Sequence, residues 1–321
     1  MNPSTEWQEN VTAGEEDRFA AYARAFADAQ QRKNRKYGPG RALHRKQGAA
    51  LRAQFEALPD LPAYARHGLF ATAARYTAWV RLSNGSGDKK ADGRPDIRGF
   101  SFKVFGPSGP AALSGTATTQ DFLLINHPTF ALPSADEFVG LALAVIAGPG
   151  RLLRYLVGRY GFIGALRKMK QLASTFGKPF SGFATEPFYS AAPFACGPFA
   201  ARARLLPASH DKNPQASNDW GADFHQRVAQ EPLQFDFQLQ FFVDEAHTPI
   251  ENPTVDWPEH VSPYLTVGRL TVVQQAADPA FANEVDAAHF DIWGGLAAHR
   301  PLGEIMRARK ATYYASQTGR T

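Results

Sequence analysis

The residues near the end of the chain carry its most distinctive chemical pattern. Arg309 and Tyr313 are four residues apart in RKATYY (309–314), so on a helix they share one face, one turn apart. A guanidinium that donates to the phenol oxygen favours the phenolate form of tyrosine, whose unperturbed pKa is about 10. Tyr314 points about 100° away on the same helix, and we expect it to be a packing residue.

His67 is a second candidate for chemistry. It stands in LPAYARHGLF, after a segment that begins at Pro62 and just before an expected strand, among apolar neighbours. Histidine changes charge near neutral pH and can act as a general acid–base. A histidine in such surroundings is more often a hydrogen-bonded core residue. His67 alone therefore does not distinguish a catalytic role from a structural one.

The sequence lacks the motifs of several common kinds of site. It has no HExxH zinc motif, no Walker phosphate loop, no GxSxG nucleophile elbow and no GxGxxG after a strand. The glycine-rich stretch 83–93 carries charges between two expected strands, which favours a solvated hairpin loop. The single cysteine, Cys196, excludes an internal disulfide and a cysteine-based zinc cluster.

Composition and charge narrow the class of protein. The 321 residues are 44% hydrophobic, enough for the core of one large domain, and the 24 Phe can fill that core or line a cavity. Lys and Arg number 35 against 30 Asp and Glu and are scattered, so we expect no nucleic-acid partner. The N-terminal stretch has no apolar run, and the longest apolar run, 139–150, is too short to cross a bilayer. We expect a cytoplasmic protein.

Hydrophobic periodicity predicts an α+β fold. Residues 1–58 form a helical arm, because apolar positions recur every three or four residues through 15–58. Residues 59–321 form one domain, with a helical insertion over 134–173 and a terminal helix over 301–317. Apolar and polar residues alternate in the expected strands 76–85, 98–109, 118–128, 198–208, 233–244 and 264–275. About eight antiparallel strands of this kind commonly close into a barrel.

Six segments between residues 61 and 320 resemble, in order, the haem-binding core of the catalase family. They are LPAYARH (61–67), VRLS (80–83), DIRGFSFKV (96–104), FLLINHP (122–128), TVDWP with VGRL (254–258 and 267–270), and RKATY with a later arginine (309–313 and 320). The resemblance implies a catalase-like β-barrel flanked by helices. Haem b, iron protoporphyrin IX, would lie between this barrel and the C-terminal proximal helix.

The resemblance also implies roles for single residues. Tyr313 would be the axial ligand of the haem iron, with Arg309 beside it. His67 would be the distal acid–base, held by a hydrogen bond from Ser83. The residues implied to bind the cofactor are Arg81 and Arg320, which would pair with haem propionates, together with Arg309, Tyr64 and Phe130.

The distal side departs from the family pattern. Thr119 takes the position of the catalytic distal asparagine, with Gln120 next to it, and Tyr64 stands where catalases have an arginine three residues before the distal histidine. Loss of the amide removes a donor that orients a second peroxide molecule. We therefore expect a haem peroxidase for hydrogen peroxide or organic hydroperoxides, with weak or no catalase activity.

Two other functions stay open. One is a fatty-acid hydroperoxide isomerase or lyase of the allene oxide synthase type, and the other is a non-catalytic carrier of haem or lipid. Residues 138–170 are apolar with six cations, a pattern that suits contact with a membrane surface or with an acyl chain. The simpler interpretation is an amphipathic helix covering the barrel. The expected partners are a peroxide, a small organic or lipid substrate and a second copy of the chain.

Overall fold

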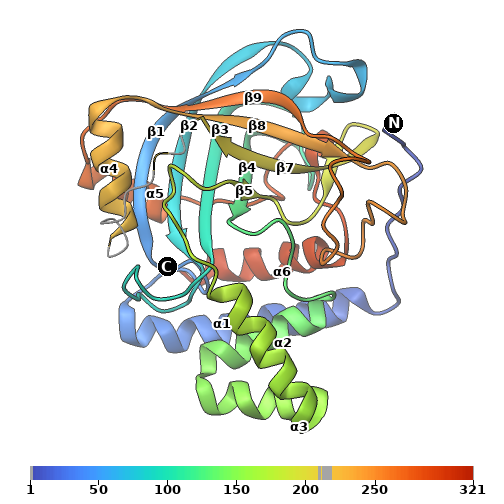
Figure 1. Ribbon diagram of the computed structural model, residues 1–321, viewed down its shortest axis with the longest axis vertical. Helices are drawn as coiled ribbons and strands as arrows, with labels where there is room; N and C mark the ends of the chain where they lie inside the picture. The colour runs from blue at the N-terminus through green and yellow to red at the C-terminus, as the bar shows by residue number, and fades with distance from the viewer. Residues whose placement is uncertain (1–2, 209–210, 212–218, 321) are drawn as a thin grey trace.

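An antiparallel β-barrel forms the body of the computed structural model, which describes residues 3–208, 211 and 219–320 (Figure 1). Its strands are β1 (Gln47–Ala57), β2 (Ala74–Asn84), β3 (Arg98–Pro110), β4 (Thr116–Ile125), β5 (Phe188–Tyr189), β6 (Phe194–Cys196), β7 (Phe199–Pro207), β8 (Leu233–Phe241) and β9 (Leu265–Val272). The sheet order is β5-β4-β3-β2-β1-β9-β8-β7-β6, and β5 also pairs with β7. This pairing closes eight strands into a barrel and leaves β6 beside β7. The predicted antiparallel barrel is confirmed.

Phenylalanine rings fill the barrel interior. The ring centroid of Phe237 lies 4.6 Å from that of Phe122 and 5.5 Å from that of Phe102, and Phe55 stacks on Phe102 at 5.7 Å. All four side chains are buried. Aromatic pairs at these separations attract one another beyond their burial of apolar area. The phenylalanines therefore build the core, and a ligand site of any size must lie outside the barrel interior.

The prediction that residues 41–58 are helical is wrong. This segment contains β1, which pairs with β2 on one side and with β9 on the other. Leu51, Ala53 and Phe55 are buried, whereas Arg52 and Gln54 between them are exposed. That alternation has the period of a strand and not of a helix. The helical arm therefore ends at Tyr37, and the next segment is a central strand of the barrel.

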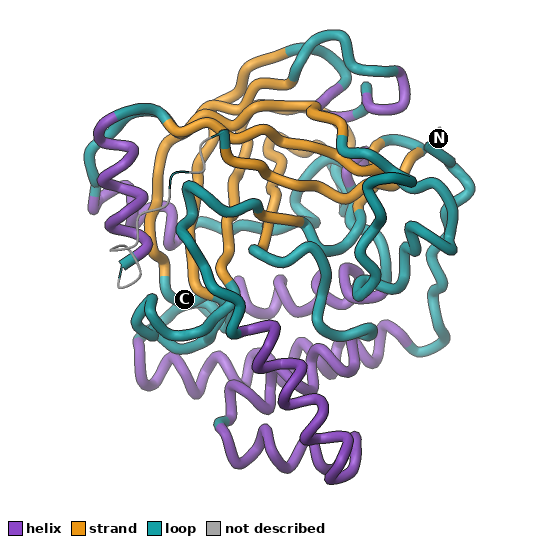
Figure 2. The backbone as a smooth tube through the Cα atoms, viewed as in Figure 1, coloured by secondary structure: helices purple, strands orange, loops and turns teal. Residues whose placement is uncertain are grey.

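The helices lie mainly to one side of the barrel, as the purple segments of Figure 2 show. They are α1 (Glu15–Tyr37), α2 (Ala135–Ala147), α3 (Pro149–Phe176), α4 (Trp220–Gln230), α5 (Pro279–Ala287) and α6 (Glu304–Thr318), with short 3-10 turns at Ala63–Ala65, Gly68–Phe70 and Ala297–His299. Helices α4 and α5 were not predicted from the sequence. α6 packs beside α1, and α2 and α3 form the end of the molecule farthest from the barrel strands (Figure 1).

One mostly buried cation fixes the start of α6. Arg307 pairs with three carboxylates at 2.9 Å, those of Glu9, Glu15 and Glu251. Glu9 and Glu15 lie in or before α1, and Glu251 lies in the loop after β8, so Arg307 ties three segments to α6. The hydrogen bond from Arg307 is the main cause that lowers the pKa of Glu15. A lowered carboxyl pKa means that this cluster stabilises the fold above that group's unfolded pKa.

Replacing Arg307 by alanine should lower the free energy of unfolding at neutral pH by about 3 kcal/mol, because it leaves three nearly buried carboxylates without their cation. The pKa of Glu15 is depressed in the folded state, so its contribution is present at neutral pH and is lost as the pH falls through the acidic range. The difference between wild type and Arg307→Ala should therefore shrink in acid. Urea unfolding at neutral and acidic pH measures it.

The control is Arg75→Ala. Arg75 pairs with Glu56 at 3.2 Å, but its side chain is 76% exposed, so we expect a change of less than about 1 kcal/mol at either pH. An Arg307 variant that behaves like this control would show that the three-carboxylate cluster does not anchor α6.

Candidate functional site

α6 presents the pair on which the site is centred. The Nη2 atom of Arg309 donates to the phenol oxygen of Tyr313 at 2.5 Å, one helical turn away. The guanidinium also lies 4.9 Å from the centre of the Tyr313 ring. The other terminal nitrogen of Arg309, Nη1, contacts the sulfur of Met306 at 3.3 Å, and this contact helps to orient the guanidinium. The four-residue spacing therefore produces the donor–phenol contact that the sequence predicted.

A cavity of about 600 Å³ separates this face of α6 from the outer wall of the barrel. Arg309, Tyr313 and Arg320 line it from α6 and the residues that follow, and Arg81 lines it from β2. His44, in the loop before β1, lies on the barrel side. The barrel wall and α6 thus hold polar side chains on opposite sides of one space of ligand size.

Two histidines, His44 and His127, line this cavity, and His44 is the one bonded to Ser83. Its Nδ1 atom is 3.0 Å from the hydroxyl oxygen of Ser83, near the end of β2. Burial, followed by the charges of Arg81, Arg309 and Arg41, lowers the pKa of His44 to about 3. His44 is therefore neutral at physiological pH, with Nδ1 tied to Ser83. A neutral, fixed imidazole can accept a proton.

Three guanidinium groups gather around a single carboxylate beside the cavity. The Oδ1 atom of Asp286 accepts from Arg41 at 2.8 Å and from Arg81 at 3.0 Å. Arg41 and Arg320 both donate to the carbonyl oxygen of Ala288, at 2.8 and 3.1 Å. Burial, followed by the like charges of Arg81 and Arg320, lowers the pKa of Arg41 to about 8. The cluster has an excess of positive charge, which favours an anion.

Comparison with known proteins identifies the architecture. The sequence model of the catalase family matches residues 2–156. A fungal catalase superposes with a TM-score of 0.70 at 16% identity, over 91% of this chain and 62% of that one. A bacterial catalase gives 0.66 at 14% identity, over 99% and 63%, and catalase A from Saccharomyces cerevisiae gives 0.67 at 15%, over 100% and 67%. The chain has the fold of these catalases, and its N-terminal half matches the catalase family model.

The chain spans less than two thirds of the length of the fungal and bacterial catalases that it resembles. At these identities the structural likeness establishes the fold. A search of curated proteins found no match. The assignment of residues to a haem site therefore depends on the geometry of the cavity.

The cavity residues fit a haem of the kind that the catalase resemblance implies. Tyr313 supplies a phenol oxygen that can bind iron, with the Arg309 cation on it. The buried Nε atoms of Arg81 and Arg320 have no hydrogen-bond partner in the described part of the chain. An unsatisfied buried donor is costly, and a carboxylate such as a haem propionate would satisfy both. Phe130, as predicted, lines the same cavity.

His67 does not lie at this cavity. It stands beyond the far end of β1, where its ring is 6.0 Å from that of Phe199. β1 has 11 residues, and a strand of that length spans about 35 Å, so His67 and His44 lie at opposite ends of the barrel. The prediction that Ser83 holds His67 is therefore wrong, because Ser83 contacts His44.

Tyr64 also lies away from the cavity, because it is close to His67 in the chain. Its ring packs on Phe241 at 5.0 Å at the His67 end of the barrel, so it does not reach the cavity as predicted. Tyr314, expected to be a packing residue, is instead 71% exposed.

The course of β4 shows where Thr119 and Gln120, the residues at the expected distal-amide position, lie. Thr119 is paired with Phe105 and does not line the cavity, whereas Leu123 on the same face of β4 does. Gln120 is buried, and its side chain accepts from the backbone of Leu296 at 2.9 Å. Among the described residues that line the cavity there is no Asn or Gln. The distal amide predicted to be missing has no replacement there.

Sequence reasoning missed His44 and Arg41, although a signal was present. Catalases have an arginine three residues before the distal histidine, and Arg41-Ala42-Leu43-His44 has that spacing, whereas the segment ending at His67 does not. The segment 41–58 was interpreted as helix, which hid the fact that His44 directly precedes a barrel strand. The spacing and the strand together would have identified it.

The arginine cluster predicts a second stability effect. Asp286→Asn should lower the free energy of unfolding by about 2 kcal/mol, because it removes the carboxylate shared by two buried guanidinium groups, while Asp286 itself is half exposed. Asp236→Asn removes a more exposed pair with Arg269 and should cost less than about 1 kcal/mol. Equal losses in urea unfolding would mean that the cluster does not need its carboxylate.

Proposed function

We propose that this chain is a haem-dependent peroxidase that reduces hydrogen peroxide or organic hydroperoxides and has weak or no catalase activity. The observation that carries the proposal is the placement of His44 with Ser83 opposite Tyr313 with Arg309, across one cavity. The catalase fold adds support. An oxidoreductase with haem b as cofactor is the assignment that explains both sides of the cavity.

Tyr313 would hold the cofactor by ligating its iron through the phenol oxygen. Arg309 donates to that oxygen and so favours its anionic form, because a fixed cation stabilises a neighbouring negative charge. Arg81 and Arg320 would bind the propionates through the donors that have no partner within the described chain. When bound, the haem iron would supply the redox chemistry of O–O bond cleavage.

His44 would move the proton. Its Nδ1 atom is fixed at Ser83, so the Nε2 atom is the one available to substrate. A neutral imidazole accepts the proton of a hydroperoxide at one oxygen and returns it to the oxygen that leaves. Ser83 would act as a positioning residue, since it touches the imidazole and not the substrate. This role, first expected of His67, is the one that the cavity geometry supports for His44.

The absence of an amide on the described cavity wall supports weak dismutation. Gln120 is the nearest amide in sequence to the expected position, and its side chain is occupied by the Leu296 and Asp121 backbones. A second hydrogen peroxide would find no such donor to orient it. An external reductant is then the better source of electrons for the second half of the cycle.

A second candidate is rearrangement of fatty-acid hydroperoxides, which needs no reductant. It is favoured by the shape of the cavity, which continues from Tyr313 to apolar side chains of the helical insertion, among them Leu141, Leu156 and Leu172. Such a wall suits an acyl chain. Product analysis with a fatty-acid hydroperoxide, in the presence and absence of a reductant, separates the two reactions. Failure with every peroxide would leave a haem or lipid carrier.

Tyr313→Phe should abolish or severely weaken haem retention, because it removes the ligand oxygen. Tyr314→Phe is the matched control, since Tyr314 is exposed and should leave haem content unchanged. The Soret absorbance per protein after reconstitution with haemin measures both. Normal haem content in Tyr313→Phe, with loss in Tyr314→Phe, would move the ligand by one residue.

His44→Ala should retain haem but lower the rate of reaction with hydrogen peroxide by about 100-fold or more, the usual contribution of a general acid–base. His67→Ala should react at the wild-type rate, because His67 lies at the other end of the barrel. Stopped-flow absorbance after mixing with peroxide gives both rates. A slow His67 variant beside an unchanged His44 variant would reverse the assignment.

A further inference from the structure

The helical insertion exposes most of the large apolar side chains on the described surface. Ten such side chains are exposed, and seven belong to α2 or α3: Val145, Leu153, Val157, Phe162, Ile163, Leu166 and Met169. Soluble proteins rarely expose large apolar side chains together unless the patch binds something. The simpler interpretation predicted that the insertion covers the barrel. Instead, α3 packs on α2 (Figure 1).

A break in α3 places the most exposed of these residues at a corner. Gly161 has φ 68°, a left-handed conformation that interrupts the helix and that glycine adopts without strain. Directly after it, Phe162 is 70% exposed and Ile163 is 67% exposed. Leu166 and Met169 follow at the spacing of one helix face. The corner therefore presents a compact apolar tip.

Cations surround this tip. α3 contains six Arg and Lys and no Asp or Glu. Arg159 pairs with Asp136 and Glu137, whereas Arg151, Arg154 and the cations after the corner have no ion pair within the described chain. An apolar helix face flanked by such cations is typical of a segment that lies in the interface of an anionic bilayer.

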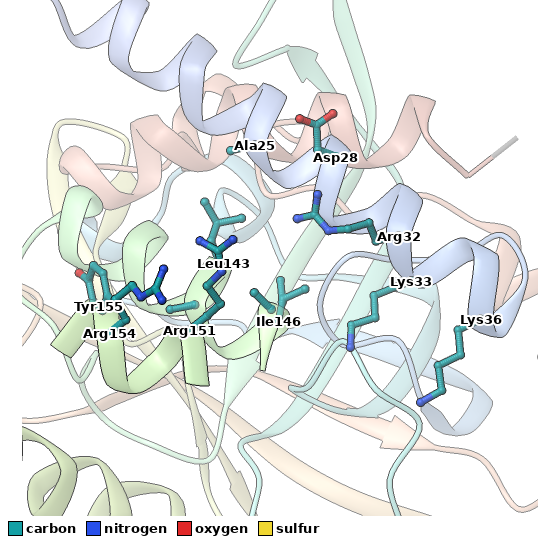
Figure 3. A pocket seen from close by; sticks show the side chains of 12 residues that line it. Ala25, Asp28, Arg32, Lys33, Lys36, Leu143, Ile146, Arg151, Arg154 and Tyr155 are labelled. Carbon is teal, nitrogen blue, oxygen red and sulfur yellow. The ribbon is translucent and has the colours of Figure 1, made fainter. Parts of the chain in front are cut away.

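A basic groove lies beside the same helices. It has a volume of about 840 Å³ and runs between α1 and the α2–α3 insertion (Figure 3). Arg32 and Lys36 line it from α1, and Arg151 and Arg154 line it from α3, over an apolar floor that includes Leu143. Asp28 is the acidic residue of this lining. The groove suits phosphate groups with apolar chains below them.

We propose that the α2–α3 insertion docks the protein on the surface of an anionic phospholipid bilayer. The tip at Phe162 and Ile163 would enter the headgroup region, and the cations of α3 and of the groove would contact lipid phosphates. Charge favours this occupant over a second copy, because two such faces would bring like charges together. No helix in the described part of the chain is long and apolar enough to span a membrane, so the contact is peripheral.

The test is co-sedimentation of the purified full-length chain with vesicles. With vesicles of phosphatidylcholine containing about one third phosphatidylglycerol, wild type should bind, and binding should fall at least tenfold in pure phosphatidylcholine or in about 0.5 M salt. Phe162→Ser/Ile163→Ser should weaken binding by about tenfold or more, because the inserted apolar area is lost. Arg151→Gln/Arg154→Gln should weaken binding to the anionic vesicles while keeping the apolar tip.

The matched control is Val11→Ser/Leu113→Ser, which removes two apolar side chains that are 65% and 51% exposed outside the insertion. It should bind like wild type. No binding to anionic vesicles, or equal loss in Phe162→Ser/Ile163→Ser and in the Val11→Ser/Leu113→Ser control, would overturn the proposal. A wild-type dimer that Phe162→Ser/Ile163→Ser dissociates, without vesicle binding, would assign the face to self-association and overturn it as well. The proposed docking does not require haem. Vesicle binding can therefore fail while Tyr313 binds haem, and haem binding can fail while the chain binds vesicles.

Discussion

The packing of phenylalanine rings inside the barrel is the constraint on which the rest of the structure depends. Phe55, Phe102, Phe122 and Phe237 occupy the interior at van der Waals separations, so the strands cannot enclose a large ligand. Polar residues that face outward from β2 and from the loop before β1 therefore define the site. α6 completes it, held in place by the ion pairs of Arg307 and by its packing on α1.

Positive charge is the main electrostatic feature of this site. Four arginines lie around the cavity: Arg41, Arg81, Arg309 and Arg320. Asp286 pairs with two of them, Arg41 and Arg81, and burial with like-charge repulsion lowers the pKa of Arg41. An anionic ligand relieves that repulsion. Burial, together with these positive charges, lowers the pKa of His44, so the side chain that would accept a proton stays neutral. The proposed binding of an anionic cofactor and the proposed proton transfer by a neutral base would therefore both depend on these buried arginines.

The strands and the α6 pair could be predicted from sequence because each depends on local spacing. Alternation identified β2, β3, β4, β7, β8 and β9, and the four-residue spacing of Arg309 and Tyr313 produced the contact that the structure has. β1 was missed because its small alanines weaken the alternation, and Leu51 and Phe55 are also four residues apart, as on a helix face. The error then favoured His67 over His44, since a local motif does not say at which end of the barrel it lies.

The measurement that tests the central claim most directly is an anomalous-scattering map, collected at the iron absorption edge, from crystals of the haem-loaded protein. The account predicts one iron peak in the cavity outside the barrel, bonded to the phenol oxygen of Tyr313, with His44 on the opposite face. An iron peak beside His67, inside the barrel, or in the basic groove between α1 and α3 would contradict it.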